Sequence, residues 1–229
     1  MSKQSNPVSF RLGLSQNWNI IFNCYNINFI PYINLLYTQI KIKQYITKVL
    51  KRYNLIGNIP ELIIHSQFFN LTLYYFNKKE FKSHKILKLL KKIYFTSIKW
   101  TNSPLILNFY KQQVWTNTSY LLMKYIKFLI KKQNFKYIFR KKIQTKLINQ
   151  INKKTICYNI FGPKILKLTG IKICCKGRFG NHRSSLSQTH KILIGSLPSL
   201  KLNSYIDYNQ DYVFTKRGVY GIQIWIFYS

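Results

Sequence analysis

Hydrophobic residues in the first half of the chain alternate between helical and strand-like spacing. They recur at the 3.6-residue period of an amphipathic helix over 38–53 and again over 82–95. The runs 61–66, 69–76 and 104–110 are short and apolar, and the second alternates at the two-residue period of a half-buried strand. This order of helix, strand, strand, helix and strand predicts one compact α+β unit.

The second half begins with helical spacing and ends with strand-like spacing. The segments 119–132 and 135–152 are both helical in spacing, which predicts a helical hairpin. Gly and Pro residues between 162 and 170 end this helical region. Beyond it lie four runs that predict strands: 171–176, 184–194, 202–208 and 221–228. The segment 152–169 receives no assignment.

The first thirty-odd residues have little periodicity and predict an extended, Asn-rich arm. The chain is therefore predicted to be an α+β protein with three parts. These are an N-terminal arm over 1–37, an α+β domain over 38–112, and a C-terminal domain over 113–229 in which helices pack on a mixed sheet.

The charge of the chain is strongly one-sided. Its 229 residues include 37 Lys and Arg but only 4 Asp and Glu, for a formal net charge of +33. Self-repulsion of this size destabilises a compact state unless a polyanion neutralises it. Nucleic acid is the predicted partner, with anionic lipid as the alternative. Hydrophobic residues make up 47% of the chain, which excludes a disordered tail because such tails are too polar to form a core.

Residue usage points to an A/T-biased genome. Alanine is absent, while Asn, Ile, Lys, Tyr and Phe, which share A/T-rich codons, are abundant. Such a bias is typical of organelles, so the predicted location is the mitochondrial matrix, with a plastid as the second possibility. Few of the cations are arginines, and the planar guanidinium makes paired contacts with phosphate that lysine cannot copy. The arginines are Arg11, Arg52, Arg140, Arg178, Arg183 and Arg217.

The residues for catalysis are scarce. Two-metal phosphoryl transfer needs clustered carboxylates, and the chain has only Glu61, Glu80, Asp207 and Asp211. The last two are interpreted as turn residues or partners of an arginine, with a metal site as the weaker alternative. No Walker A, G-x-S-x-G or H-E-x-x-H motif occurs. The chain is predicted not to be an enzyme.

The cysteines predict no metal site. Cys24, Cys157, Cys174 and Cys175 include no C-x-x-C pair. Adjacent Cys174 and Cys175 would point to opposite faces of a strand, which is poor geometry for one zinc ion. They are interpreted as small apolar residues in a reducing compartment, and no cofactor is predicted.

The most apolar early stretch does not predict a membrane span. Residues 19–37, NIIFNCYNINFIPYINLLY, are interrupted by asparagines and a proline, whereas a spanning helix needs about 20 mostly apolar residues. No stable membrane insertion is predicted. The N-terminal residues also lack the cationic start and apolar run of a signal peptide.

The segment GIKICCKGRFGNHRSS (170–185) combines glycines with cations between two strand-like runs. A phosphate-binding loop of a nucleotide site is expected between a strand and a helix instead. The segment is therefore interpreted as a strand and a connecting turn. Arg178, His182 and Arg183 are predicted to contact RNA from this turn.

Four blocks resemble the small-subunit ribosomal protein S-three family and stand in the order of that family. They are NPVSFRLGLSQNW (6–18), IKIKQYITKVL (40–50), GIKICCKGRFGN (170–181) and YIDYNQDYVFTKRGVYGIQIWIF (205–227). The resemblance implies an arm, a type II K-homology domain over 38–112, and a C-terminal mixed-sheet domain. It also implies three partners: small-subunit rRNA, neighbouring proteins of the subunit head, and mRNA at the channel through which it enters.

Three segments depart from the pattern of that family, and one of them is the unassigned segment 152–169, which resembles an insertion before Gly170. In the basic segment FRKKIQTK (139–146), Arg140 and Lys141 correspond to the family's cationic pair at the mRNA channel, whereas Gln144 replaces a third cation. The G-x-x-G loop by which K-homology domains clamp a nucleic-acid backbone is lost from YFNKKEFKSHK (75–85), which has no glycine. Only generic phosphate contacts are expected there.

The resulting hypothesis is a structural, RNA-binding constituent of a mitochondrial small ribosomal subunit. The alternatives are an organelle-encoded intron maturase or nuclease fragment, and a membrane-associated organellar protein. The predicted RNA contacts are Arg11, Arg52, Lys78, Lys79, Lys82, Arg140, Lys141, Lys142, Lys146, Arg178, His182, Arg183 and Arg217.

Overall fold

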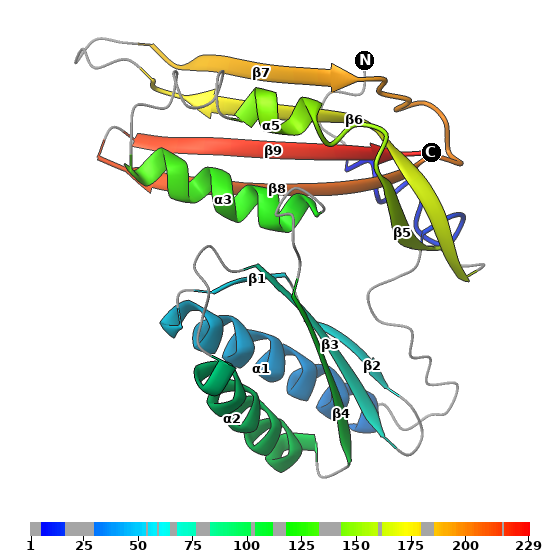
Figure 1. Cartoon of the computed structure of the whole chain (residues 1–229), viewed down its shortest axis with the longest axis vertical. Helices are drawn as coiled ribbons and strands as arrows, with labels where there is room; N and C mark the ends of the chain where they lie inside the picture. Colours follow the sequence, from blue (N-terminus) through cyan, green and yellow to red (C-terminus); the bar gives the residue numbers. More distant parts are fainter. Residues whose placement is uncertain are drawn as a thin grey trace. The chain divides into compact units, whose positions relative to one another are not determined.

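A computed structural model describes most of the chain, which forms two compact units (Figure 1). One unit combines Met1–Trp18 with Trp115–Ser229, and the other is Asn19–Val114. The described residues are 6–16, 30–53, 55–58, 60–64, 68–76, 83–101, 104–111, 118–132, 143–159, 162–179, 186–216 and 218–229. We call the unit that contains Trp115–Ser229 the C-terminal unit, and we call Asn19–Val114 the inserted unit. Both contain helices and sheet, so the predicted α+β class is confirmed.

In the inserted unit two helices cover one face of a four-stranded sheet. Strand β3 is central, with β4 parallel to it on one edge and β1 and β2 antiparallel on the other. The elements are α1 (Ile30–Arg52), β1 (Ile56–Gly57), β2 (Glu61–Ile64), β3 (Phe69–Phe76), α2 (Ser83–Thr101) and β4 (Leu105–Lys111). The predicted order of helix, strand, strand, helix and strand is confirmed, with the short β1 as an addition.

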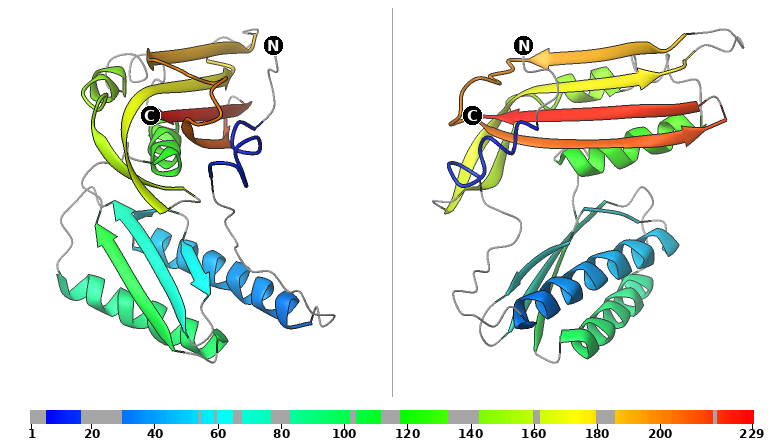
Figure 2. Two further views of the ribbon diagram at one scale, coloured as in Figure 1. Left: turned by 90° about the vertical axis from the view of Figure 1, so that its right-hand side faces the viewer. Right: turned by 180° about the vertical axis from the view of Figure 1, so that it is seen from behind.

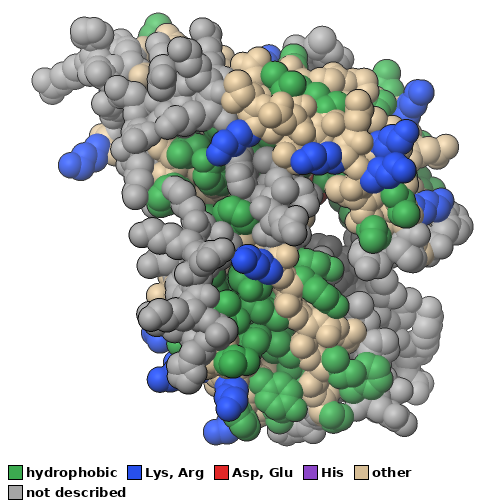
Figure 3. Space-filling view, in the orientation of Figure 1, with side chains coloured by type: hydrophobic (Ala, Val, Ile, Leu, Met, Phe, Trp, Pro, Cys, Tyr) green, Lys and Arg blue, Asp and Glu red, His purple; other side chains and the backbone are tan. Residues whose placement is uncertain are grey.

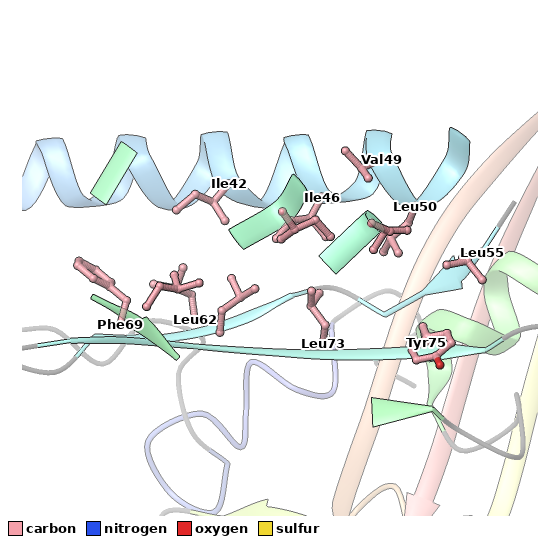
Figure 4. Close-up of a cluster of buried hydrophobic side chains, with 13 residues drawn as sticks. Ile42, Ile46, Val49, Leu50, Leu55, Leu62, Phe69, Leu73 and Tyr75 are labelled. Atoms are coloured by element: carbon pink, nitrogen blue, oxygen red, sulfur yellow. The ribbon is translucent and has the colours of Figure 1, made fainter. Parts of the chain in front are cut away.

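The core of this unit lies between the helices and β3 (Figure 4). Ile42 and Ile46 of α1 point toward the sheet, where Leu73 is completely buried. Along β3 buried and partly exposed residues alternate without interruption, as the two-residue period predicted. Helix α1 begins at Ile30, earlier than the predicted boundary at residue 38. Proline in a first helical turn costs no hydrogen bond, so Pro31 does not prevent this start.

In the C-terminal unit an antiparallel sheet carries two helices on one face. Strand β6 is central because it pairs with β5 at its start and with β7 and β9 further along; β8 then pairs with β9. The elements are α3 (Ser119–Lys132), α5 (Gln144–Ile148), β5 (Lys154–Asn159), β6 (Gly162–Gly177), β7 (Gln188–Gly195), β8 (Tyr205–Thr215) and β9 (Gly218–Tyr228).

Helix α3 and the strands near the C-terminus confirm the predicted layer of helix on sheet. Helix α3 has the predicted bounds and packs on β8 and β9, and its Leu122 and Ile126 are fully buried. The prediction of a helix over 135–152 is wrong at its end, because α5 stops at Ile148 and turns follow. The unassigned segment 152–169 forms β5 and the first part of β6, an antiparallel hairpin.

Residues 6–16 form a series of turns that belongs to the C-terminal unit rather than an extended arm. Ser15 and Gln16 both reach the segment before and within β8. The Ser15 hydroxyl donates to the Leu202 carbonyl at 3.2 Å, and the Gln16 amide donates to the Ile206 carbonyl at 2.9 Å. This part of the predicted arm is therefore folded onto residues almost two hundred positions away.

Candidate nucleic-acid interface

Four of the predicted RNA contacts lie in the described part of the chain: Arg11, Arg52, Lys146 and Arg178. The other nine lie outside the described residues. They are Lys78, Lys79, Lys82, Arg140, Lys141, Lys142, His182, Arg183 and Arg217. The structure therefore gives the positions of only these four residues.

Arg52 and Lys146 are exposed at the surface, each on a helix. Arg52 ends α1, where it follows Lys51 in the last turn. Lys146 lies on the outer side of α5, whose Ile143 and Leu147 are buried against the rest of the unit. Both cations can reach a phosphate without any loss of packing, as the predicted role requires.

Arg178 lies directly after β6 and is partly buried. The Tyr220 hydroxyl of β9 donates a hydrogen bond of 2.6 Å to the Arg178 carbonyl, which holds the backbone at the end of the strand. At the preceding residue, a Cβ on Gly177 would lie 2.6 Å from the Tyr220 ring. The predicted strand in the segment 170–185 is confirmed, and the glycine is needed for close packing on an aromatic ring.

The prediction that Arg11 contacts RNA is wrong, because this side chain is buried with 2% of its surface exposed. Its Nε donates to the Ser204 carbonyl at 2.9 Å, and its Nη1 donates to the Pro7 carbonyl at 2.8 Å. Its Nη2 donates to the carbonyls of Ser199 and Lys201 at 3.0 and 2.8 Å. Burial lowers the pKa of the Arg11 guanidinium below its ordinary value. The guanidinium is a structural clamp between the N-terminal turns and the segment before β8.

The two carboxylates of the C-terminal unit have structural partners on α3. Asp207 accepts hydrogen bonds from the backbone N–H and the hydroxyl group of Ser119, at 2.7 and 2.6 Å. Asp211 forms an ion pair with Lys127. The expectation of turn residues or arginine partners is wrong, since both aspartates lie within β8 and their partners are a serine and a lysine. The only Asp and Glu residues of this unit therefore lie on the side of β8 that faces α3, and both bind that helix.

One face of the described surface is cationic and apolar. In the face drawn in Figure 3, Lys and Arg side chains are scattered over both units, hydrophobic side chains are frequent, and no Asp or Glu side chain is seen among the described residues. Such a surface repels cations and attracts polyanions over the range of a Debye length.

Nothing in the described residues indicates a metal centre. No group of three or more His, Cys, Asp or Glu side chains gathers in that part of the chain. Cys174 and Cys175 point to opposite faces of β6 and are both buried. Burial raises the pKa of the Cys157 thiol to about 11 and that of Cys175 further, which keeps these thiols protonated. Cys24 lies outside the described residues.

Among the helices that the structure describes, none is both long and apolar enough to cross a bilayer.

Comparison with known proteins gives full-length relatives. Small ribosomal subunit protein uS3m of Chondrus crispus is 29% identical over 234 residues, which cover 100% of this chain and 95% of the relative. Small ribosomal subunit protein uS3 of Pelagibacter ubique (strain HTCC1062) is 26% identical over 228 residues, covering 99% of this chain and 90% of that protein. The chain is a homologue of ribosomal protein uS3. No protein-family profile matches it.

The uS3 relationship extends through the middle of the chain, where the four resembling blocks did not reach. The alignment with the Chondrus protein spans both units, including the segment 60–160, most of which lies outside the four blocks. The family resemblance that was inferred from the four sequence blocks is therefore confirmed along the whole chain.

The structural role of Arg11 had one signal in the sequence of this uS3 homologue. Arg11 stands in the run VSFRLGL, where apolar residues flank the cation on both sides. A cation that becomes buried must be paired or hydrogen-bonded. The carbonyls of residues 199–204 that bind it could not be identified from the sequence.

Proposed function

We propose that this uS3 homologue is a structural constituent of the small subunit of a mitochondrial ribosome and that it binds the rRNA of that subunit. Both curated relatives are named as small ribosomal subunit proteins, and the Chondrus relative carries the mitochondrial designation. Similarity along the whole chain supports a shared role, since both units are included.

The observation that carries this proposal is the distribution of charge over the folded chain. The chain has a net charge of +33, and its described carboxylates Asp207 and Asp211 are already bonded to residues of α3. A compact protein with this excess needs a dense polyanion, and rRNA supplies one negative charge per nucleotide. Each phosphate that a lysine or arginine neutralises releases counterions, which makes the affinity fall steeply with salt.

The finer placement is also a proposal. We infer a position in the head of the subunit near the channel through which mRNA enters, with the basic segment 139–146 at that channel. The helix and strand order of the inserted unit supports a K-homology scaffold over 38–112, joined to a C-terminal domain over 113–229. Since 75–85 contains no glycine, it cannot form the G-x-x-G loop that clamps a nucleic-acid backbone. This scaffold would then contact RNA only through its lysines, and other surfaces would supply the tighter binding.

The proposed role is not enzymatic. Of the four carboxylates in the chain, Asp207 and Asp211 are held by Ser119 and Lys127 and are not arranged for Mg²⁺. The maturase or nuclease alternative requires metal-dependent strand cleavage that Asp207→Asn or Asp211→Asn abolishes. The proposal requires that neither variant change any background cleavage.

Sedimentation of a detergent-cleared organelle lysate in high salt tests the proposal. The chain is followed by mass spectrometry beside the rRNA of the small subunit. Co-migration with that rRNA from a mitochondrial lysate is expected, and co-migration from a plastid lysate would change the organelle but not the role. Sedimentation as free protein, or in the carbonate-resistant membrane pellet, would contradict it.

A further inference from the structure

One face of the sheet in the C-terminal unit carries α3 and α5. On the other face the turns 6–16 lie against the end near Ile206, and no described helix or strand covers the rest, which we call the uncovered face (Figure 2, right). Strand register assigns the side chains on this uncovered face. Cross-strand partners in antiparallel strands project to the same side. Across β7, β6, β9 and β8 the rows are Leu193–Lys172–Trp225–Tyr208, Lys191–Cys174–Gln223–Gln210 and Thr189–Lys176–Gly221–Tyr212.

This face combines exposed aromatic rings with lysines. Tyr212 and Phe214 are 59% and 70% exposed, and their ring centroids are 5.3 Å apart. A second pair, Tyr208 and Trp225, has centroids 5.2 Å apart. Large aromatic side chains left this open to water are uncommon on a stable sheet, because their burial contributes much of the free energy of folding.

Three lysines share the face with the aromatic rings. Lys172 lies with its Nζ 4.6 Å from the centroid of the Trp225 ring. Lys176 and Lys191 are exposed, and together with Lys172 they act on the thiol of Cys174, since their positive charges oppose the burial that raises its pKa. In the strand register Lys172 and Lys176 flank Cys174 along β6, and Lys191 is its cross-strand partner on β7, so the three lysines are neighbours on this face.

No carboxylate balances these lysines. Asp207 and Asp211 are the only Asp or Glu residues of the C-terminal unit. Their neighbours in β8, Tyr208, Gln210 and Tyr212, project to the opposite face, and both aspartates bind α3. Alternation along β8 thus separates the carboxylates on the helix side from aromatic rings and cations on the uncovered side.

Gly221 leaves space beside the most accessible rings. It is the cross-strand partner of both Lys176 and Tyr212, and a Cβ placed on it would meet no atom within 4 Å. A flat group stacked on Tyr212 can extend over this glycine toward Lys176. The shape, the rings and the charge all suit a nucleobase whose phosphate lies near the lysine.

We propose that the uncovered face of the β7–β6–β9–β8 sheet binds single-stranded RNA. Bases stack on Tyr212 and Phe214 over Gly221, and Lys172, Lys176 and Lys191 bind the phosphates. The proposal rests on the proposed function, because it names the surface through which this uS3 homologue holds unpaired segments of rRNA. A sheet with exposed aromatic rings and cations suits single strands, since every base has a face that can stack and duplexes hide theirs.

The test measures binding of the purified full-length chain to a short fluorescein-labelled oligouridine by fluorescence anisotropy over a range of salt concentrations. The double substitution Tyr212→Ser with Phe214→Ser is expected to weaken binding by about 10-fold or more at every salt concentration. Its control is Phe95→Ser, which removes a ring that is 61% exposed on α2. In the double variant and in the control, the slope of log Kd against log salt concentration should equal that of wild type, because neither loses a charge.

Gly221→Val separates loss of the site from loss of folding. Valine favours a strand and meets no atom within 4 Å at its Cβ, so stability should be kept or raised. It nevertheless fills the space beside Tyr212, and affinity for oligouridine should fall several-fold. Combined substitution of Lys172, Lys176 and Lys191 by Gln should reduce the salt slope by about 2. Lys153→Gln with Lys154→Gln, two exposed cations elsewhere, is the control for lost charge.

The outcomes distinguish this proposal from the proposed function. If the wild-type chain sediments with small-subunit rRNA but Tyr212→Ser with Phe214→Ser and Gly221→Val bind oligouridine as tightly as wild type, the face does not bind RNA. If those variants keep their RNA affinity and fail to enter the subunit, the face binds a protein, which also overturns the proposal. A wild-type chain that does not sediment with rRNA at all contradicts the proposed function instead.

Discussion

Asp207 in β8 accepts two hydrogen bonds from Ser119, the first residue of α3, although 88 positions separate them. The first turn of α3 contains no acidic residue of its own. The positive end of the helix dipole and its free N–H groups therefore receive their carboxylate from the sheet. This contact fixes the position of the first residue of α3 against β8.

Replacing Asp207 by Ala should destabilise the chain by about 1–3 kcal/mol, because the Ser119 N–H and hydroxyl lose their acceptor in a partly buried place. Asp211→Ala is the matched control. Its ion pair with Lys127 is partly exposed, so its loss should cost less than about 1 kcal/mol. Urea unfolding of both variants gives the comparison. Equal losses in the free energy of unfolding would show that Asp207 stabilises the start of α3 no more than the ion pair of Asp211 stabilises its middle.

The pH dependence of stability should report the same carboxyl group. Burial raises the pKa of Asp207 above 3.8, and the Ser119 hydrogen bonds only partly oppose this shift. A group with a raised pKa binds its proton more tightly in the folded state. Its contribution to stability is therefore complete below the unfolded pKa and is lost as the pH rises through the folded pKa.

The free energy of unfolding of wild type relative to Asp207→Asn should accordingly decrease as the pH rises from about 3.8 toward neutrality. Urea titrations at a series of pH values measure this difference, in which the effects of all other groups cancel. A relative stability that increases with pH would mean that hydrogen bonding, and not burial, dominates the pKa.

Arg11→Lys should lower stability by about 2–3 kcal/mol, because one ammonium group cannot replace a guanidinium that binds the carbonyls of Pro7, Ser199, Lys201 and Ser204. Arg52→Lys, at an exposed helix end, should change stability by less than about 0.5 kcal/mol. Neither should alter the salt slope of RNA binding, because the number of charges is kept. A stable Arg11→Lys variant would refute the clamp.

Gly177→Ala should destabilise the sheet by about 1–3 kcal/mol, because its Cβ would lie 2.6 Å from a ring carbon of Tyr220 and would displace a ring whose hydroxyl holds Arg178. Gly221→Ala is the control on a neighbouring strand, since nothing lies within 4 Å of its Cβ. Thermal unfolding should show a lower Tm for the first variant only. Similar Tm values would mean that Tyr220 can move aside at little cost.

The elements that could be predicted are those whose apolar residues face a core. Strand β3 and helix α3 have their predicted bounds because one side of each is buried, so the sequence carries the period of the element. The β5–β6 hairpin lacks this signal. Its Ile156 and Ile165 are 64% and 70% exposed, and their spacing reflects no buried face. Its strands are joined by backbone pairing, which depends little on the type of side chain.

The amino-acid sequence by itself determined the charge, the uS3 resemblance and the elements with a periodic buried face, and it predicted the class of partner. These depend on composition and on neighbours a few residues apart. Only the tertiary structure decided which polar groups would be used internally. Arg11 is enclosed by carbonyls about 190 positions away, and Asp207 meets a helix 88 positions away. Such contacts depend on how distant segments meet, and the spacing of residues along a chain does not contain that information.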